Sequence, residues 1–264
     1  MQRAAPLGRD DATPKGGATV VVLGTGGTIA GMAASAADNV GYTAARTGVA
    51  QLVAGLAGAP AVLVVEQVAQ IDSKDMDFAV WQRLAERVGH HLARPEVAGI
   101  VITHGTDTLE ETAYFLHRVF APLKPVVLTG AMRPATSLQA DGPQNLQDAI
   151  TLAAGSEASG VLVVMAGTVH AGAEVRKIHP YRLDAFSSGE SGALARIEEG
   201  RVRLLRRWPV GPALGTDILA ADTSRWPAVE IVTSCSGARG SVVQALCAAG
   251  VRGIVVAATG SGTV

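Results

Sequence analysis

Short runs of apolar, β-branched residues alternate along the chain with longer stretches in which apolar residues recur every three or four positions. The short runs predict buried strands and the longer stretches predict amphipathic helices, most clearly at residues 77–94. Strands are expected at residues 19–23, 61–68, 97–103, 125–129 and 161–165, and helices at 49–56, 77–94, 109–120 and 145–154. Apolar strands that alternate with helices predict an α/β fold whose parallel sheet is covered on both faces.

The pattern changes after Glu174. Residues 193–197 and 202–206 flank a Glu-Glu-Gly turn and predict a hairpin. Strand, helix and strand then follow at 229–233, 242–249 and 253–257. We therefore expect a flexible arm at 1–17, a Rossmann-like parallel-sheet N-terminal domain at 18–207, a linker at 208–227, and the start of a smaller, incomplete α/β domain at 228–264. An incomplete domain predicts exposed apolar surface around Ile231 and residues 254–257.

Composition excludes several classes of protein. Hydrophobic residues make up 48% of the chain and charged residues 17%, which excludes a disordered polar chain. The formal net charge of −1 lacks the basic excess of nucleic-acid-binding proteins. No run of about 20 apolar residues predicts a membrane span, and Asp10 and Asp11 argue against a signal peptide. The two cysteines, Cys235 and Cys247, are too few for a disulfide framework, so we expect a reducing, cytoplasmic location.

The first motif with chemical potential is the turn GTGGT at residues 24–28, directly after the first predicted strand. Ile29 stands where a dinucleotide fingerprint requires glycine, and Met32 follows Gly31 where a P-loop requires lysine. Ligands of open parallel sheets bind outside the carboxyl ends of the strands, where this turn presents Thr25 and Thr28. The alternative is that both threonines only satisfy the backbone of the turn.

The second motif is THGTDTLEE at residues 103–111, between a predicted strand and a predicted helix. Thr108 and Glu111 fit a capping box that starts the helix. Thr106 and Asp107 then lie at the carboxyl end of the strand, beside free helix N–H groups, which predicts a site for an anion or a carboxylate. The alternative is that Asp107 is only an N-cap.

Two further segments follow the next strands. Residues 130–134 read GAMRP and open a long loop of a type that is often functional. Lys177 follows the fifth strand, and a single lysine is usually a solvated surface charge unless it meets a partner such as Asp107. The six histidines show no metal-ligand spacing, so no metal is expected. His90 and His91 lie on the predicted helix at 77–94 and are expected at its surface.

Taken together, these motifs make the chain resemble the threonine-dependent bacterial L-asparaginases of the asparaginase/glutaminase family. The resemblance runs from Val20 to about Gly262 and is carried by TGGTIAG at 25–31, HGTDTLEETA at 104–113, GAMRP at 130–134 and residues 137–145. It implies hydrolysis of L-asparagine to L-aspartate and ammonia through an acyl-enzyme, with glutaminase side activity. It further implies a small-molecule substrate, no cofactor and a homotetramer.

The resemblance also implies a catalytic set. Thr28 matches the nucleophile, and Tyr42 matches the tyrosine of a mobile lid that polarises the nucleophile's hydroxyl. The lid corresponds to residues 29–43, whose Gly, Ala and Ser content predicts a mobile loop. Thr106 and Asp107 match a second threonine and its acid, and Lys177 matches the lysine paired with that acid.

The substrate-binding set follows from the same resemblance. Ser73 matches the serine that binds the α-carboxylate, and Asp107 also holds the α-amino group. Lys74, Gly105 and Ala131 complete the set. Lys74 is a departure, because relatives often carry Gln or Glu beside the serine, and it is expected to alter recognition of the amino group and of glutamine.

Other departures keep alternatives open. Ala173-Glu174 replaces the more usual Arg-Asp before the lysine. The family continues beyond Val264, so the chain is expected to be a fragment, a frameshifted product or a partial sequence. One alternative is a truncated, weakly active or non-catalytic relative that binds an amino acid. A nucleotide-dependent enzyme is disfavoured by the broken glycine fingerprint, and amide transfer on tRNA by the near-neutral charge.

Overall fold

The computed structural model describes residues 17–56, 58–155 and 157–263 of the 264-residue chain. The predicted flexible arm at 1–17 lies outside these ranges except for its last residue. The chain forms two compact units, with the boundary between Leu219 and Ala220. Within the described ranges, no helix combines the length and the apolar character that a membrane span requires.

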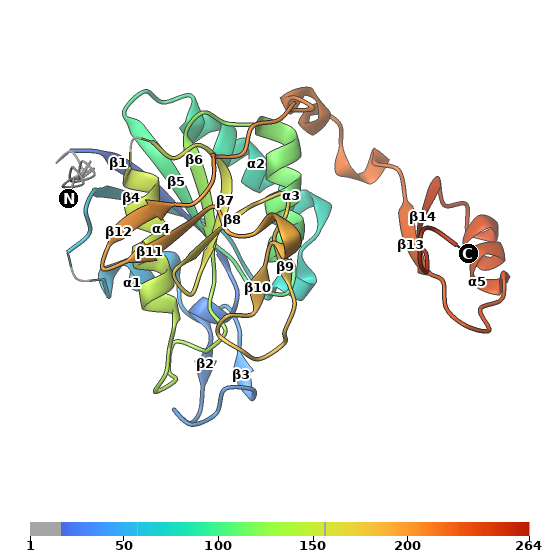
Figure 1. Cartoon of the computed structure of the whole chain (residues 1–264), viewed down its shortest axis with the longest axis horizontal. Coiled ribbons are helices and arrows are strands. Elements are labelled where there is room, and N and C mark those ends of the chain that lie inside the picture. Colours follow the sequence, from blue (N-terminus) through green and yellow to red (C-terminus); the bar gives the residue numbers. More distant parts are fainter. Residues whose placement is uncertain (1–16, 57, 156, 264) are drawn as a thin grey trace, which may run out of the picture. The chain divides into compact units, whose positions relative to one another are not determined.

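The first unit is built on an eight-stranded sheet in the order β12-β11-β8-β7-β6-β5-β1-β4 (Figure 1). Five neighbouring strands are parallel and confirm the predicted α/β sheet. They are β4 (Val62–Ile71), β1 (Thr19–Gly26), β5 (Val97–Thr103), β6 (Pro125–Thr129) and β7 (Gly160–Met165). Because these strands are parallel, the turns that follow β1 and β5 meet at one edge of the sheet.

Three antiparallel strands extend this sheet: β8 (Thr168–Ala171), β11 (Ala195–Glu198) and β12 (Arg201–Leu204). The β11–β12 pair is the predicted hairpin. The sequence analysis did not predict strand β8, which forms because the chain turns back after β7 through Ala166 and Gly167. Both turn residues have positive φ, 48° and 68°, as a two-residue hairpin turn requires. The alanine hides this turn from sequence patterns that rely on Asn, Asp or Gly.

Helices cover both faces of the sheet. α1 (Val49–Ala54) and α4 (Gly142–Ala154) bury their apolar side chains against one face, and α2 (Phe78–Leu92) and α3 (Leu109–Phe120) against the other. Strand β1 shows the division, because Val20 and Val22 join the first core cluster while Val21 and Leu23 join the second. All four are fully buried. Burial on both faces explains why the strands are continuous apolar runs.

Two small antiparallel pairs lie outside this sheet. β2 (Met32–Ala33) pairs with β3 (Tyr42–Thr43), and β9 (Arg176–Lys177) pairs with β10 (Phe186–Ser187). The segment at 29–43, predicted as a loop, therefore contains the single-turn 3₁₀ helix η1 (Thr28–Ala30) and the β2–β3 pair. The other 3₁₀ turns are η2 (Ser73–Asp75), η3 (Gly189–Ser191), η4 (Thr216–Ala220) and η5 (Thr223–Arg225).

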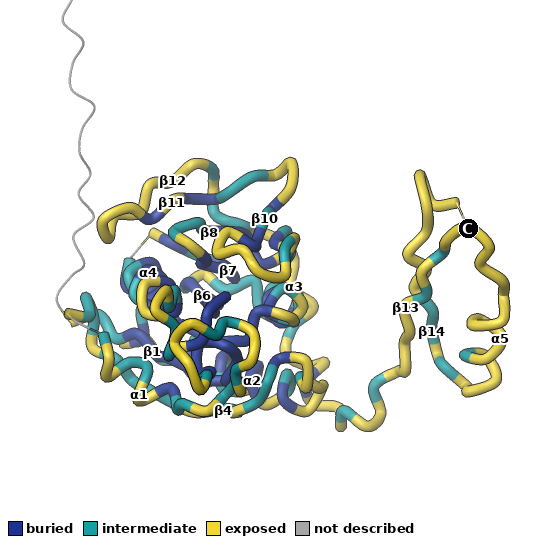
Figure 2. The backbone as a smooth tube through the Cα atoms, turned by 90° about the horizontal axis from the view of Figure 1, so that it is seen from below, coloured by how far each residue is buried: buried dark blue, intermediate teal, exposed yellow. Residues whose placement is uncertain are grey.

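The second unit contains β13 (Val229–Thr233), α5 (Ser241–Ala248) and β14 (Gly253–Ala257), with the two strands parallel. These elements match the predicted strand, helix and strand. Figure 2 shows the unit largely exposed, in contrast to the buried strands of the first unit. Ile231 is 74% exposed and Val255 54% exposed, which agrees with the predicted apolar surface.

Candidate active site

The site forms where the turns after β1 and β5 touch. Gly27 has a φ of 83°, and a Cβ atom there would lie 2.3 Å from the backbone N of Gly105. A Cβ atom on Gly105 would in turn lie 2.4 Å from the hydroxyl of Ser73. Glycine is required at both positions, because a side chain on Gly27 would push the backbone of Gly105 away and one on Gly105 would displace the Ser73 side chain. Three segments far apart in sequence thereby meet at one point.

Thr28 opens the 3₁₀ helix η1 and is buried. Its hydroxyl lies 2.6 Å from the phenolic oxygen of Tyr42 in β3, and either group can donate the hydrogen bond. The Asp38 carboxylate holds the turn that precedes Tyr42, because it accepts backbone N–H bonds from Gly41 and Val40. Those two bonds lower the pKa of the Asp38 carboxyl.

The segment that carries Tyr42 lies against the loop after β6. Four hydrogen bonds join the two segments: Ala135 N–H to the Gly31 carbonyl (2.9 Å), Ala33 N–H to the Thr136 hydroxyl (2.9 Å), Leu138 N–H to the Ala36 carbonyl (3.1 Å) and the Ser137 hydroxyl to the Asn39 side-chain oxygen (2.7 Å). The Tyr42 segment is therefore held over Thr28 by contacts near its rim.

The second group of polar side chains centres on Lys177. Its ammonium donates to the Thr106 hydroxyl at 2.8 Å and to the Asp107 carboxylate at 2.6 Å. Lys177 therefore meets Asp107, the partner that the sequence analysis required before this lysine could be more than a surface charge. The Lys177 side chain is 16% exposed, whereas that of Asp107 is 61% exposed. One end of the ion pair is sheltered, and the carboxylate remains open to a ligand.

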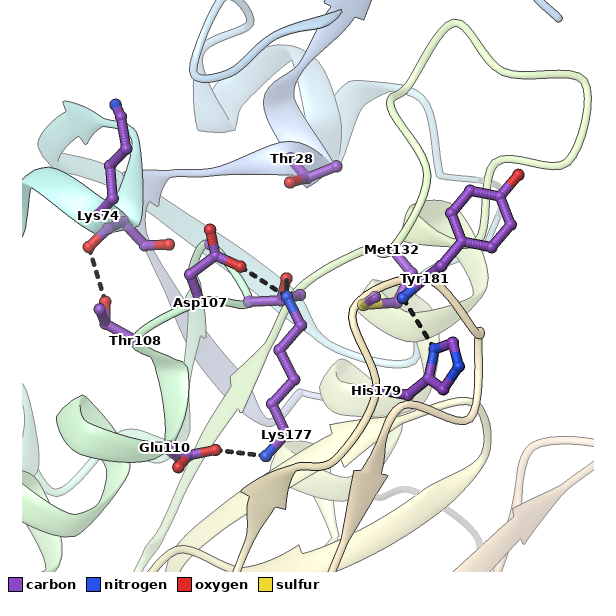
Figure 3. Close-up of polar contacts among 12 residues, drawn as sticks. Thr28, Lys74, Asp107, Thr108, Glu110, Met132, Lys177, His179 and Tyr181 are labelled. Carbon is purple, nitrogen blue, oxygen red and sulfur yellow. Dashed lines mark hydrogen bonds and ion pairs between the residues drawn. The ribbon is translucent and has the colours of Figure 1, made fainter. Parts of the chain in front are cut away.

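Thr108 differs from its predicted role. Its hydroxyl makes no capping bond to α3 but donates to the backbone carbonyl of Ser73 at 2.8 Å. The predicted capping box with Glu111 is therefore wrong, because a tertiary contact uses the hydroxyl. Figure 3 shows this bond between the α3 end and the Ser73 turn. The bond fixes Ser73, which is buried and N-terminal in η2, beside the Thr106 turn.

One cavity of about 180 Å³ lies between the two groups. Six residues predicted from the sequence line it: Thr28, Tyr42, Thr106, Asp107, Ala131 and Lys177. Five further residues complete the lining: Asn39, Val40, Met132, Pro180 and Tyr181. Of these five, the sequence analysis placed only Met132 in a motif, GAMRP at 130–134, and it named none of them as a site residue. Their position in the sequence could have identified them, because they lie close to Tyr42, Ala131 and Lys177 in the chain.

Three predicted binding residues lie outside this lining. Ser73 and Gly105 lie directly behind it in the contact described above. Lys74 is different, because its ammonium forms ion pairs with Asp72 at 3.2 Å and Asp75 at 3.0 Å. Its side chain is 63% exposed and points away from Thr28 (Figure 3).

The Asp141 carboxylate orders the start of the loop after β6. Asp141 accepts the backbone N–H groups of Met132 and Arg133, at 3.0 and 2.9 Å. The buried Arg133 guanidinium donates to the Tyr181 carbonyl at 2.7 Å and lies 4.0 Å from the centre of the Tyr181 ring. Arg133 thereby connects the GAMRP turn to the cavity wall formed by Tyr181.

His104 fixes the backbone beside Thr106 in the second group. Its Nδ1 donates to the Gly105 carbonyl (2.7 Å), so its Nε2 accepts the Thr112 hydroxyl (2.9 Å). Trp81 in turn donates its ring N–H to the Thr112 hydroxyl at 2.8 Å. Burial lowers the pKa of His104 to about 4, so the imidazole is neutral at pH 7. Protonation would place a second donor opposite the Thr112 hydroxyl.

Two remaining sequence predictions concern histidines and metals. His91 is buried, with its Nε2 at 2.9 Å from the Glu66 carboxylate, so the expectation that it is a surface residue is wrong. It occupies the sheet-facing side of α2, where a polar ring needs a partner. His90 is exposed as predicted. Among the residues that the structure describes, no cluster of three or more His, Cys, Asp or Glu could hold a metal ion.

Comparison with known proteins identifies the relatives of this chain. The family model described as "Asparaginase, N-terminal" matches residues 19–210. The glutaminase-asparaginase of Pseudomonas fluorescens biotype A is 39% identical over 251 residues, which cover 94% of this chain and 69% of that protein. L-asparaginase 2 of Escherichia coli (strain K12) is 40% identical over 247 residues, covering 92% and 70%.

A solved structure supports the same relationship. The crystal structure of a probable cytoplasmic L-asparaginase from Campylobacter jejuni superimposes with a TM-score of 0.87 at 38% identity. The match covers 94% of this chain and 77% of that one. By its motifs, its fold and these matches, the chain belongs to the asparaginase family.

Proposed function

We propose that this protein hydrolyses L-asparagine to L-aspartate and ammonia, with Thr28 as the nucleophile. The observation that carries the proposal is the cavity between the Thr28–Tyr42 hydroxyl pair and the Thr106–Lys177–Asp107 group. Relatives named L-asparaginase and glutaminase-asparaginase support this substrate class. A cavity of about 180 Å³ suits a small amino acid.

In the first step the Thr28 oxygen attacks the side-chain amide carbon of the substrate. Tyr42 is placed to relay the hydroxyl proton of Thr28, since the two oxygens are 2.6 Å apart: its phenolic oxygen accepts that proton while its own proton passes on toward the amide nitrogen. The branched Thr28 side chain has few χ1 rotamers, so little entropy is lost in aiming it. Backbone N–H groups of the glycine turns stabilise the oxyanion, an effect worth about 3–4 kcal/mol for one donor elsewhere. The amide nitrogen leaves with an added proton as ammonia.

In the second step water attacks the acyl-enzyme and releases L-aspartate and the Thr28 hydroxyl. The Thr106 hydroxyl, polarised by the Lys177 ammonium, passes the proton to the leaving amine in the first step and relays a proton from this water back toward Thr28 in the second. The exposed Asp107 carboxylate holds the α-ammonium of the substrate, and Ser73 binds its α-carboxylate. Lys74 is retained as a proposal only for an indirect effect on Ser73, because its ammonium contacts Asp72 and Asp75.

The finer features are part of the same proposal. Glutaminase side activity is supported by the relatives that carry both activities in their names. A homotetramer is proposed from the family resemblance, and light scattering of the full chain tests it. The cytoplasm is the proposed location, in line with the description of the Campylobacter jejuni relative.

The decisive experiment measures ammonia and aspartate from L-asparagine for the parent, Thr28→Ala and Thr106→Ala. We expect equal amounts of both products from the parent and at least about a thousandfold less from either variant. Thr151→Ala is the matched control, because that hydroxyl donates to the Gln147 carbonyl within α4. Full turnover by Thr28→Ala would refute the nucleophile. Aspartate binding by the parent without ammonia release would refute hydrolysis and favour an amino-acid-binding protein.

A further inference from the structure

The backbone of Lys177 lies outside the large sheet, although its ammonium must stay in place at the site. It lies in the two-residue strand β9, outside the large sheet, and pairs with Phe186 of the equally short β10. The neighbouring bond, from Ile178 N–H to the Ala185 carbonyl (2.7 Å), lies within the same hairpin. A short isolated pair of strands is marginal by itself. The contact that anchors this hairpin to the site therefore matters.

Glu110 provides such a contact. It lies in the first turn of α3, and its carboxylate accepts the backbone N–H of Lys177 (Figure 3). Asp107, three residues earlier in the chain, accepts the ammonium of the same lysine. One turn of chain thus binds Lys177 at both ends, at its backbone and at its charged head. A charged acceptor makes a stronger bond than a neutral one.

A general electrostatic role does not account for this geometry. Acidic residues in the first turn of a helix interact favourably with the helix dipole, and both Glu110 and Glu111 satisfy that preference. The placement of the Glu110 carboxylate on the Lys177 backbone, which the helix dipole does not require, connects α3 directly to that lysine. Glu111 is exposed and serves as the matched control from the same helix turn.

We infer that Glu110 is a positioning residue, which holds the backbone of Lys177 so that its ammonium stays on Thr106 and Asp107. The inference rests on the proposed function for the catalytic role of Lys177. It does not require Glu110 to touch substrate. It requires a side chain at position 110 that is long enough to place an acceptor oxygen on the Lys177 N–H. Two conservative variants therefore separate the effect of side-chain length from the effect of charge.

The first test compares turnover of Glu110→Gln, Glu110→Asp and Glu111→Asp. Gln keeps the reach and an acceptor oxygen but loses the charge, so its kcat is expected within about threefold of the parent. Asp keeps the charge but is one methylene shorter, so kcat should fall by about tenfold or more, with KM within about twofold. Glu111→Asp should match the parent. An equal loss in the Gln and Asp variants, or none in Asp, would overturn the inference.

The second test does not depend on activity. Folded protein is treated with an amine-acetylating reagent, and mass spectrometry follows the modification of Lys177. Lys124, which donates to the Leu92 and Arg94 carbonyls, is the internal reference. Lys177 should react several-fold faster in Glu110→Asp than in the parent, Glu110→Gln or Glu111→Asp, and equal rates in all four would overturn the inference.

These two readouts also separate the inference from the proposed function. If the parent releases no ammonia, hydrolysis is refuted and the labelling rates alone decide the role of Glu110. If the parent is active but the labelling and turnover of Glu110→Asp match the parent, only the positioning role is refuted. Thermal melting of each variant confirms that folded proteins are compared.

Discussion

The two cavity threonines occupy similar turns but have different partners. Thr28, after β1, meets the neutral phenol of Tyr42, which comes from a segment bound to the rim at 135–138. Thr106, after β5, meets the ammonium of Lys177, whose charge is balanced by Asp107. The first partner belongs to a peripheral pair of two-residue strands, and the second is attached to α3 through Glu110.

From this difference we infer that the two threonines have different catalytic roles. A neutral partner on a peripheral segment leaves Thr28 free to lose its proton and to be uncovered when substrate enters. A charged partner held by α3 keeps Thr106 in one geometry and suits it to repeated proton transfer. The following predictions test that contrast, beginning with the largest expected effect.

Removal of the charge at the second threonine should have the largest effect. In Lys177→Met the Thr106 hydroxyl loses its donor and Asp107 loses its counter-ion. We expect kcat/KM to fall about a thousandfold, which corresponds to about 4 kcal/mol. Steady-state ammonia release measures this, with Lys124→Met as the control because Lys124 binds carbonyls away from the cavity. A loss of less than tenfold would show that the mechanism does not need the Lys177 charge.

Acid should lower the stability of the fold that holds Thr106, Lys177 and Asp107 together. The pKa values of buried His104 and His170 are lowered to about 4, mainly by loss of solvation, whereas an unfolded histidine titrates near 6.5. Between these values the unfolded chain binds more protons, so the stability that neutral histidines provide is present above pH 6.5 and is lost as pH falls toward 4. The loss is on the order of 3 kcal/mol for each imidazole at full effect.

Urea unfolding at pH 7, 5.5 and 4.5 measures this loss. The free energy of unfolding should decrease steadily over that series, and the decrease should be shallower in His104→Gln than in the parent. An unfolding free energy that stays constant down to pH 4.5 would contradict the lowered pKa values. Since His104 borders Gly105 and Thr106, acid should also reduce turnover before it reduces the helical content.

Removal of the neutral partner should have the smallest of the three effects. Tyr42→Phe keeps the ring on Thr28 but removes the phenolic oxygen, and we expect kcat to fall about a hundredfold with KM little changed. Tyr114→Phe is the control, because Tyr114 is 52% exposed on α3 and outside the cavity lining. If Tyr42→Phe costs more than Lys177→Met, the contrast between the two threonines is reversed.

Much of the fold could be predicted because the information is local. Apolar runs, helical spacing and turn residues located β5, α3, β6, β13 and β14 at their observed bounds. The β7–β8 hairpin could not be predicted, since Ala166 takes a positive φ without a residue type that favours it. The burial of His91 in α2 was also missed, because its partner Glu66 lies in β4, 25 residues away in sequence.

The candidate site shows the same limit. The glycine turns, the two threonines and the resemblance they carry came from residue type and spacing alone. Lys74 pairs with its sequence neighbours Asp72 and Asp75. Tertiary structure decided the partners of the hydroxyl groups: Thr108 bonds to Ser73 rather than to its own helix, and Thr106 meets Lys177, 71 residues away. A side chain selects among partners by distance after the chain has folded, and sequence spacing cannot measure that distance.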